Sequence, residues 1–226
     1  MAKMRYFKKG MYDASIACRA TKAEGKVEMR RRTTLLVVAG VGTAMLLMTS
    51  AVALAATIDC TPDDPCRGTP EKDTMVGTAS TDEMIGKRGN DRMEGLGSTD
   101  SLSGQRDDDT LIGGKGDDEL DGYFGNDTLH GSPGGDVMRG DDDWDYPNRI
   151  DGQDRLYGGE GNDTLYGYYG DDTLVGGDGD DQINAFDDER FTGGKDFVDC
   201  GKGHDEVIFD KGVDEVRNCE VRRIAR

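Results

Sequence analysis

The chain has 226 residues and a formal net charge of -18; only 35% of its residues are hydrophobic, while 34 residues are glycine. A layered core is difficult to build from so little apolar material, because apolar burial is the main drive for folding. The acidity also argues against a nucleic-acid partner, since a polyanion has to be met by Lys and Arg. Two classes of protein remain: a disordered acidic chain, or a repeat protein that binds cations.

Residues 1–55 form a basic N-terminal extension that differs from the acidic remainder. Three Arg at 30–32 precede an apolar run over 35–48, and residues 53–55 fit the A-x-A cleavage pattern. This order predicts a secretory signal peptide, and so a secreted or cell-surface protein without stable membrane insertion after cleavage. An uncleaved membrane anchor is the alternative, because the uncharged stretch is long enough to span a bilayer.

A lead-in segment follows at 56–67, bounded by two Cys. Cys60 and Cys66 enclose a short Pro-containing loop, and we expect a disulfide between them. Four Cys remain once the signal is removed, the even number that an oxidising compartment favours.

A nine-residue period runs through 68–184. An Asp recurs in register at Asp73, Asp82, Asp91, Asp100, Asp109, Asp118, Asp127, Asp136, Asp145, Asp154, Asp163, Asp172 and Asp181. Two residues after each Asp lies an aliphatic residue or Met, with Pro147 as the exception, and five residues before it lies a Gly, with Arg149 as the exception. Register held over such a length predicts a solenoid.

The fold class that we expect is an all-β parallel β-roll. The six residues from the Gly to the Asp form a tight turn, and the three around the apolar position form a short strand with one inward side chain. Two repeats complete one coil, so residues eighteen apart stack. Asp127, Asp145 and Asp163 then lie on one edge, and Asp118, Asp136 and Asp154 on the other.

The stacked carboxylates need a counter-ion. Neighbouring coils are about 4.8 Å apart, and two carboxylates at roughly 5 Å repel by about 3 kcal/mol at an effective dielectric near 20. A bare ladder would cost more than the roughly 5–15 kcal/mol by which proteins are stable. Carboxylate and carbonyl oxygens suit Ca²⁺, so we expect several Ca²⁺ ions, with binding coupled to folding.

Three repeats resemble a known motif closely. Residues 113–120, 158–165 and 176–183 match G-G-x-G-x-D-x-U-x, and the chain resembles the RTX (hemolysin-type) calcium-binding family over about 68–217. The resemblance implies Ca²⁺ held in the turns by the motif Asp and backbone carbonyls. It implies the ligands Asp91, Asp118, Asp127, Asp136, Asp154, Asp163, Asp172 and Asp181, and weaker ones at Asp73, Asp82, Asp100, Asp109 and Asp145.

The pattern is interrupted twice. Pro147 takes a core position, so we expect that turn to bulge while the register continues to Asp154. Within a final segment at 185–226, an insertion loop at 185–192 precedes renewed repeats and a C-terminal cap. Cys200 and Cys219 are one coil plus one residue apart, which allows a disulfide that closes the cap.

The sequence carries no pattern typical of a hydrolase or nucleotide-binding enzyme, and His130 and His204 occupy ordinary repeat positions. We therefore expect a secreted calcium-binding β-roll without enzyme activity, which folds when Ca²⁺ binds. One alternative is a calcium-dependent adhesion or matrix module that binds cell-surface polysaccharide through Tyr123, Phe124, Tyr168 and Tyr169. A second, disfavoured alternative is a small β-helix polysaccharide epimerase or lyase.

Overall fold

The computed structural model describes residues 56–60, 65–141, 152–187, 194–210 and 213–224. The chain divides into two units, 1–48 and 49–226, and these residues all belong to the second. The expected signal peptide, Asp145 and most of the expected insertion loop lie outside the described residues. None of the described residues forms a helix with the length and hydropathy needed to cross a membrane.

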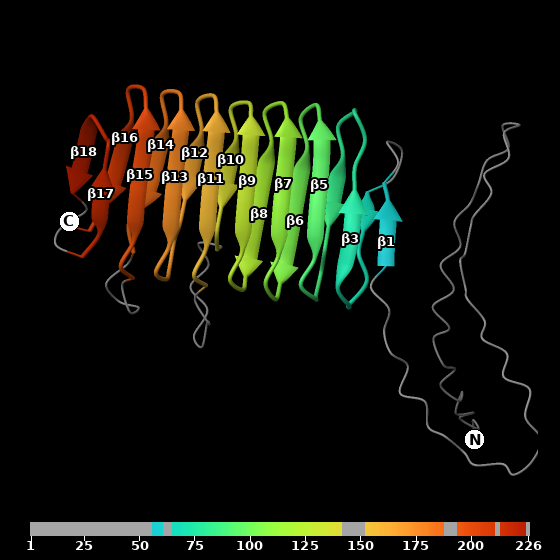
Figure 1. Ribbon diagram of the computed structural model, residues 1–226. Coiled ribbons are helices and arrows are strands. Elements are labelled where there is room, and N and C mark those ends of the chain that lie inside the picture. The colour runs from blue at the N-terminus through green and yellow to red at the C-terminus, as the bar shows by residue number, and fades with distance from the viewer. Residues whose placement is uncertain (1–55, 61–64, 142–151, 188–193, 211–212, 225–226) are drawn as a thin grey trace, which may run out of the picture. The chain divides into compact units, whose positions relative to one another are not determined.

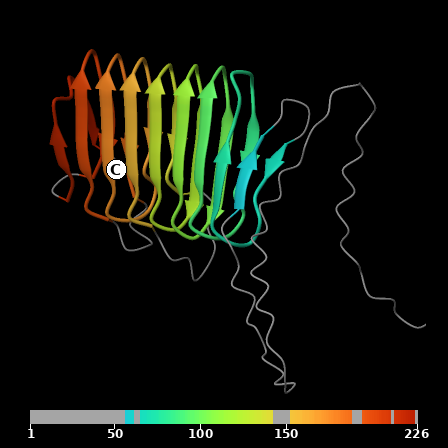
Figure 2. The same ribbon diagram turned by 45° about the vertical axis from the view of Figure 1, so that its right-hand side comes forward.

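Two parallel sheets make up the described part of the chain, and each coil contributes one strand to each sheet (Figure 1). The odd sheet contains β1 (Ala56–Asp59), β3 (Asp73–Val76), β5 (Arg92–Gly97), β7 (Thr110–Lys115), β9 (Thr128–Pro133), β11 (Arg155–Glu160), β13 (Thr173–Asp178), β15 (Phe197–Lys202) and β17 (Glu215–Arg217). The even sheet contains β2 (Cys66–Arg67), β4 (Glu83–Ile85), β6 (Ser101–Arg106), β8 (Glu119–Phe124), β10 (Val137–Arg139), β12 (Thr164–Tyr166), β14 (Gln182–Ala185), β16 (Glu206–Phe209) and β18 (Val221–Ile224). Figure 2 shows the two sheets as separate layers.

The strand register confirms two repeats per coil. Leu111 in β7 pairs with Leu129 in β9, and Leu102 in β6 pairs with Leu120 in β8. Like residues therefore stack along each sheet, which is why a strict period in the sequence gives a regular solenoid.

The prediction that residues eighteen apart continue to stack past the interruption near Pro147 is wrong. Leu129 pairs with Leu156, which lies 27 residues later instead of the 18 expected, so the spacing between stacked residues is one repeat longer here. The Asp127 N–H donates to Asp154 rather than to a carboxylate 18 residues later, and every Asp after this point lies on the opposite edge to the one expected.

Three inward residues per repeat form the core, and their order explains the composition. Along most strands the Asp, the aliphatic residue and the next Gly are buried, as at Asp109, Leu111 and Gly113. The apolar layer is thus one side chain thick: Met75, Met84, Met93, Leu102, Leu111, Leu120, Leu129, Met138, Leu156, Leu165, Leu174, Ile183, Val198 and Val207. Each fully buried side chain of this kind contributes about 1.5–3 kcal/mol.

Several strands are longer than the three residues expected. β7 has six residues and runs on through Gly113 and Gly114. The inward Gly continues the alternation of the strand, so pairing between coils extends into what the sequence suggested was turn.

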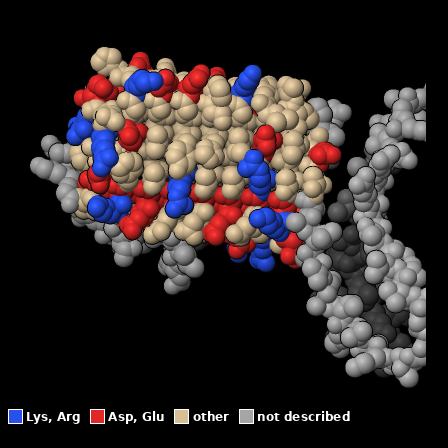
Figure 3. All heavy atoms as spheres, viewed as in Figure 1, with Lys and Arg blue, Asp and Glu red and all other residues tan. Residues whose placement is uncertain are grey.

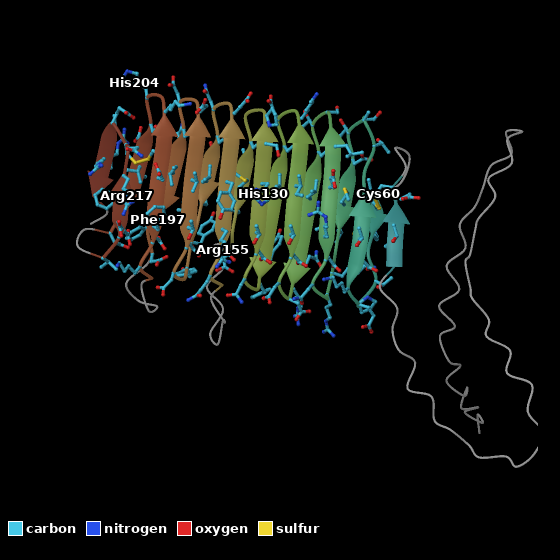
Figure 4. The ribbon with its side chains drawn as sticks, in the orientation of Figure 1. Cys60, His130, Arg155, Phe197, His204 and Arg217 are labelled. Atoms are coloured by element: carbon cyan, nitrogen blue, oxygen red, sulfur yellow. A yellow bond between two sulfur atoms is a disulfide. The ribbon has the colours of Figure 1, made fainter. Side chains whose placement is uncertain are left out.

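Both ends of the roll carry a disulfide. Cys60 bonds to Cys66 next to β1 and β2, and Cys200 bonds to Cys219, which ties β15 to the segment before β18. At the C-terminal end the Arg217 guanidinium lies 5.1 Å from the centre of the Phe197 ring (Figure 4). The disulfide-bonded cap that we expected is therefore present.

Candidate metal centre

The Asp of each repeat stands at the start of a strand, where it ends the turn and faces inward. The first ladder contains Asp73, Asp91, Asp109, Asp127, Asp154, Asp172, Asp196 and Asp214, and the second contains Asp82, Asp100, Asp118, Asp136, Asp163, Asp181 and Asp205. All except Asp214 are at most 4% exposed. Other Asp and Glu side chains gather along the same turn edges (Figure 3), so each ladder lies in a strongly acidic rim.

One oxygen of each ladder carboxylate is used to join coils. Asp109 Oδ1 accepts the Asp91 N–H at 2.8 Å, and Asp118 Oδ1 accepts the Asp100 N–H at 2.8 Å. Oδ1 of each of these Asp side chains thus takes the place of a backbone carbonyl oxygen as the acceptor between turns. This role explains why the side chain is an Asp in every coil, whether or not it binds metal.

The other oxygen is buried and, for most of the ladder, has no hydrogen-bond partner. Among the described residues this holds for Oδ2 of Asp91, Asp100, Asp109, Asp118, Asp127, Asp136, Asp163, Asp172, Asp181, Asp196 and Asp205. A buried polar atom without a partner costs about 1–3 kcal/mol, and more when it is charged. A bound cation or a proton is needed to offset such a cost over so many coils.

A second oxygen points at the same place. A Cβ added to Gly86 would lie 2.6 Å from Asp91 Oδ2 and 2.9 Å from the carbonyl oxygen of Gly104 in the next coil. At Gly122 the corresponding distances are 2.5 Å to Asp127 Oδ2 and 2.6 Å to the carbonyl oxygen of Gly140. Two acceptors therefore converge over most of these Gly residues, in a space that any other residue would fill.

Burial and mutual repulsion make the carboxylates resist ionisation when no cation is present. Burial, together with the neighbouring charges of Asp127 and Asp91, outweighs a backbone hydrogen bond that lowers the pKa of Asp109 and raises that pKa to about 8. Burial likewise raises the pKa of Asp136 to about 7. The buried carboxylates of each ladder therefore favour the binding of a proton or a metal cation.

The donor set fits Ca²⁺. No group of three or more His, Cys, Asp or Glu capable of holding a metal occurs among the described residues, so carboxylates alone do not complete a site. Hard oxygen donors drawn partly from backbone carbonyls, in a repeated and adaptable turn, are what Ca²⁺ accepts. Zn²⁺, which takes Cys and His ligands in compact clusters, does not fit such donors.

The expected difference between strong and weak ligands is only partly reflected in the geometry. Asp100 and Asp109 follow Ser98 and Asp107 instead of Gly, but both of these residues adopt the positive φ of the motif glycine, at 87° and 71°. Asp73 and Asp82 do differ, because Thr69 and Thr78 donate to their Oδ2 atoms. Asp145 lies outside the described residues.

Asp196 and Asp205 continue the two ladders, although we did not name them as ligands. The same spacing to Val198 and Val207 was the available signal. Their turns differ in one respect: Ala185 and Cys200 stand at the Gly position, so a β-carbon occupies the space left open elsewhere. The arrangement with two converging acceptors over a Gly therefore extends to Asp181.

An outer row of Asn and Asp, which the sequence reasoning missed, supports the turns from the solvent side. Asp117 Oδ1 accepts the Gly135 N–H at 2.9 Å, and Asn162 Oδ1 accepts the Asp180 N–H at 2.9 Å. The signal was the recurrent Asn or Asp directly before the ladder Asp. These side chains fix the turn backbone and so hold its carbonyl oxygens in place.

The model of the RTX calcium-binding nonapeptide repeat (4 copies) matches segments 67–102, 76–111, 94–129, 103–138, 121–146 and 150–183. No curated protein matches the chain. The matched segments together cover half of the sequence and coincide with the coils whose paired acceptors fit Ca²⁺. The chain belongs to the family of RTX calcium-binding nonapeptide repeat proteins.

Proposed function

We propose that this protein is a secreted calcium-binding β-roll that folds when Ca²⁺ binds and that catalyses no reaction. The observation that carries the proposal is the buried Oδ2 of a ladder Asp, without a hydrogen-bond partner in Asp91, Asp127 and most others, which faces a carbonyl oxygen of the next coil. Such a pair repels itself until a cation lies between the two oxygens. Metal binding and coil stacking are then one event.

The ligands that we propose are the ladder Asp from the second coil to the last open glycine: Asp91, Asp100, Asp109, Asp118, Asp127, Asp136, Asp154, Asp163, Asp172 and Asp181. Each would act with the carbonyl oxygen at the Gly position of the following coil, which for Asp181 is that of Cys200. We set Asp73 and Asp82 apart because their second oxygens already accept hydrogen bonds from Thr69 and Thr78.

Secretion is supported by the order of basic, apolar and small residues in 1–55 and by the two disulfides. Disulfides persist in oxidising compartments. Extracellular Ca²⁺ is also far more abundant than cytosolic Ca²⁺, and weak modular sites fill at about 10⁻⁴–10⁻³ M. A protein of this design would stay loosely structured inside the cell and would fold outside it.

Neither alternative activity gains support from the geometry. The Tyr166 and Tyr168 rings stack on each other with centres 5.7 Å apart, and the Arg106 guanidinium lies over Phe124, so each ring has one face covered. A flat aromatic platform for polysaccharide is thus already partly used. His130 stacks on Tyr157 in the odd sheet, whereas His204 lies coils away in the turn after β15, which offers no shared acid–base site (Figure 4).

The test is a titration of the full chain with CaCl₂ after exhaustive chelation, followed by far-ultraviolet circular dichroism, with MgCl₂ as the control. We expect a gain of β signal with Ca²⁺ at millimolar concentrations and none with Mg²⁺, which is smaller and demands octahedral geometry. An unchanged spectrum with both ions would overturn the proposal.

A further inference from the structure

The first Asp of each ladder already has donors for its second carboxylate oxygen. Asp73 Oδ2 accepts the Thr69 N–H at 2.5 Å and the Thr69 hydroxyl at 2.9 Å. Asp82 Oδ2 accepts the Thr78 N–H at 2.5 Å and the Thr78 hydroxyl at 3.0 Å. One coil later, Oδ2 of Asp91 and of Asp100 has no partner.

The backbone of the turn explains the difference. In the later turns the residue four before the Asp adopts a positive φ, as Lys87 does at 91° and Tyr123 at 76°, and its N–H donates to a carbonyl of the next coil. Thr69 and Thr78 do not adopt a positive φ. Their hydroxyls accept the N–H of the residue two positions on, at 3.2 and 3.1 Å, which is an ST-turn. The N–H of each Thr is thereby directed at the Asp instead.

A hydroxyl at this position is not sufficient by itself. Ser132 lies four residues before Asp136, but it has a φ of 85°, and Asp136 Oδ2 is without a partner. The sequences G-T-P-E-K-D at 68–73 and G-T-A-S-T-D at 77–82 also lack the second Gly of the motif G-G-x-G-x-D. The Thr turn and the glycine turn are therefore two alternative conformations of one loop.

A tethered positive charge completes the first turn. Lys87 Nζ donates to the carbonyl oxygen of Gly68 at 2.6 Å. In the following coils the equivalent carbonyl, that of Gly86 or Gly104, points toward the Gly of the preceding coil, next to an Asp Oδ2. The ammonium thus satisfies the Gly68 carbonyl oxygen, whereas the carbonyl oxygen that lies next to Asp73 Oδ2 over Gly68 is that of Gly86.

We propose that the turns 68–73 and 77–82 form a calcium-independent cap, in which hydrogen bonds from Thr69 and Thr78 satisfy the Asp Oδ2 atoms that Ca²⁺ binds in the later turns, and Lys87 satisfies the Gly68 carbonyl oxygen. The inference rests on the proposed function, because it presumes that the later turns bind Ca²⁺. A coil closed without metal gives the next coil a formed neighbour to stack on, and stacking on neighbours is the source of stability in a solenoid. Calcium-driven folding would then extend from this end.

The first test converts the cap into a binding turn. In the full chain, Thr78→Gly with Ser80→Gly creates G-G-x-G-x-D, and we expect equilibrium dialysis with CaCl₂ to detect about one additional bound Ca²⁺ per chain. Ser132→Gly is the matched control, because that turn already has a positive φ and an open carboxylate, and its count should equal that of the parent. A double variant with the parental count would overturn the proposal.

The second test needs no variant. Hydrogen exchange of the parent chain in excess chelator should leave the amides of β3 and β4 at least tenfold slower than those of β7 and β8. Equal exchange rates in the two regions would overturn the proposed cap even if equilibrium dialysis gave no usable calcium count. A parent that binds no Ca²⁺ refutes the proposed function, whereas a parent that binds Ca²⁺ without protecting β3 and β4 in chelator refutes only the cap.

Discussion

Filling one open space over a ladder Gly should remove one calcium site. In Gly122→Ala the new Cβ would lie 2.5 Å from Asp127 Oδ2 and 2.6 Å from the Gly140 carbonyl oxygen, where we place the cation. The roll backbone itself tolerates a β-carbon at this position, as Ala185 and Cys200 show in the last coils. The main cost is therefore the lost ion rather than a broken coil.

The magnitude follows from two terms. A site filled at one hundred times its Kd contributes about 2.7 kcal/mol of stability, and a tight extra methyl costs about 1–3 kcal/mol. Together they predict a loss of about 4–6 kcal/mol in urea unfolding at saturating Ca²⁺, and about one fewer bound Ca²⁺.

Gly97→Ala is the matched control for this experiment. Its Cβ would meet Lys115 at no less than 3.7 Å, which is ordinary contact, and its φ is not positive. A change within about 0.5 kcal/mol is expected there. If Gly122→Ala keeps the parental calcium count and unfolds like Gly97→Ala, the cation does not bind where the two acceptors converge.

Three further outcomes follow from the geometry. Leu96 has a φ of 84° and is 42% exposed, so Leu96→Gly should stabilise the calcium-loaded roll by about 1 kcal/mol in urea unfolding; a loss would contradict the assigned turn. Because burial raises the pKa of Asp109 to about 8 and of Asp127 to about 7, the metal-free roll binds protons more tightly than the unfolded chain. The stability that these protonated carboxylates contribute should be fully present below about pH 4 and lost as the pH rises through 7 to 8. Circular dichroism in chelator should therefore show more β signal at pH 4 than at pH 8. The opposite trend would refute the electrostatic account of the ladder. Replacing Cys200 and Cys219 together by Ala should cost about 3 kcal/mol and increase hydrogen exchange mainly in β15–β18, whereas a uniform increase would argue against a local cap.

The coil and its core could be predicted because one short rule repeats. An inward side chain recurs every nine residues, and Leu111, Leu120 and Leu129 can satisfy that rule only by stacking in alternate sheets. The turn aspartates follow from the same rule. The spacing of Cys200 and Cys219 likewise predicted their bond.

The path through the interruption could not be predicted from spacing. The residues between Asp141 and Gly152 preserve the nine-residue period, so the count alone gives no sign that stacked residues are 27 rather than 18 positions apart here. Only the residue types of Pro147 and Arg149 distinguish that repeat, and a prediction from spacing takes no account of residue type. The Thr turns were missed for a related reason, since whether Thr69 or Ser132 donates to a carboxylate depends on φ, which the residue type does not fix.

The central claim is that superposed carboxylates in this roll require a bridging cation. The most direct measurement is differential scanning calorimetry of the full chain at pH 8, where protons no longer substitute for metal, with excess chelator or with millimolar Ca²⁺. We predict a cooperative unfolding transition with Ca²⁺ and no comparable transition in chelator. A cooperative transition of equal enthalpy in both samples would contradict the account.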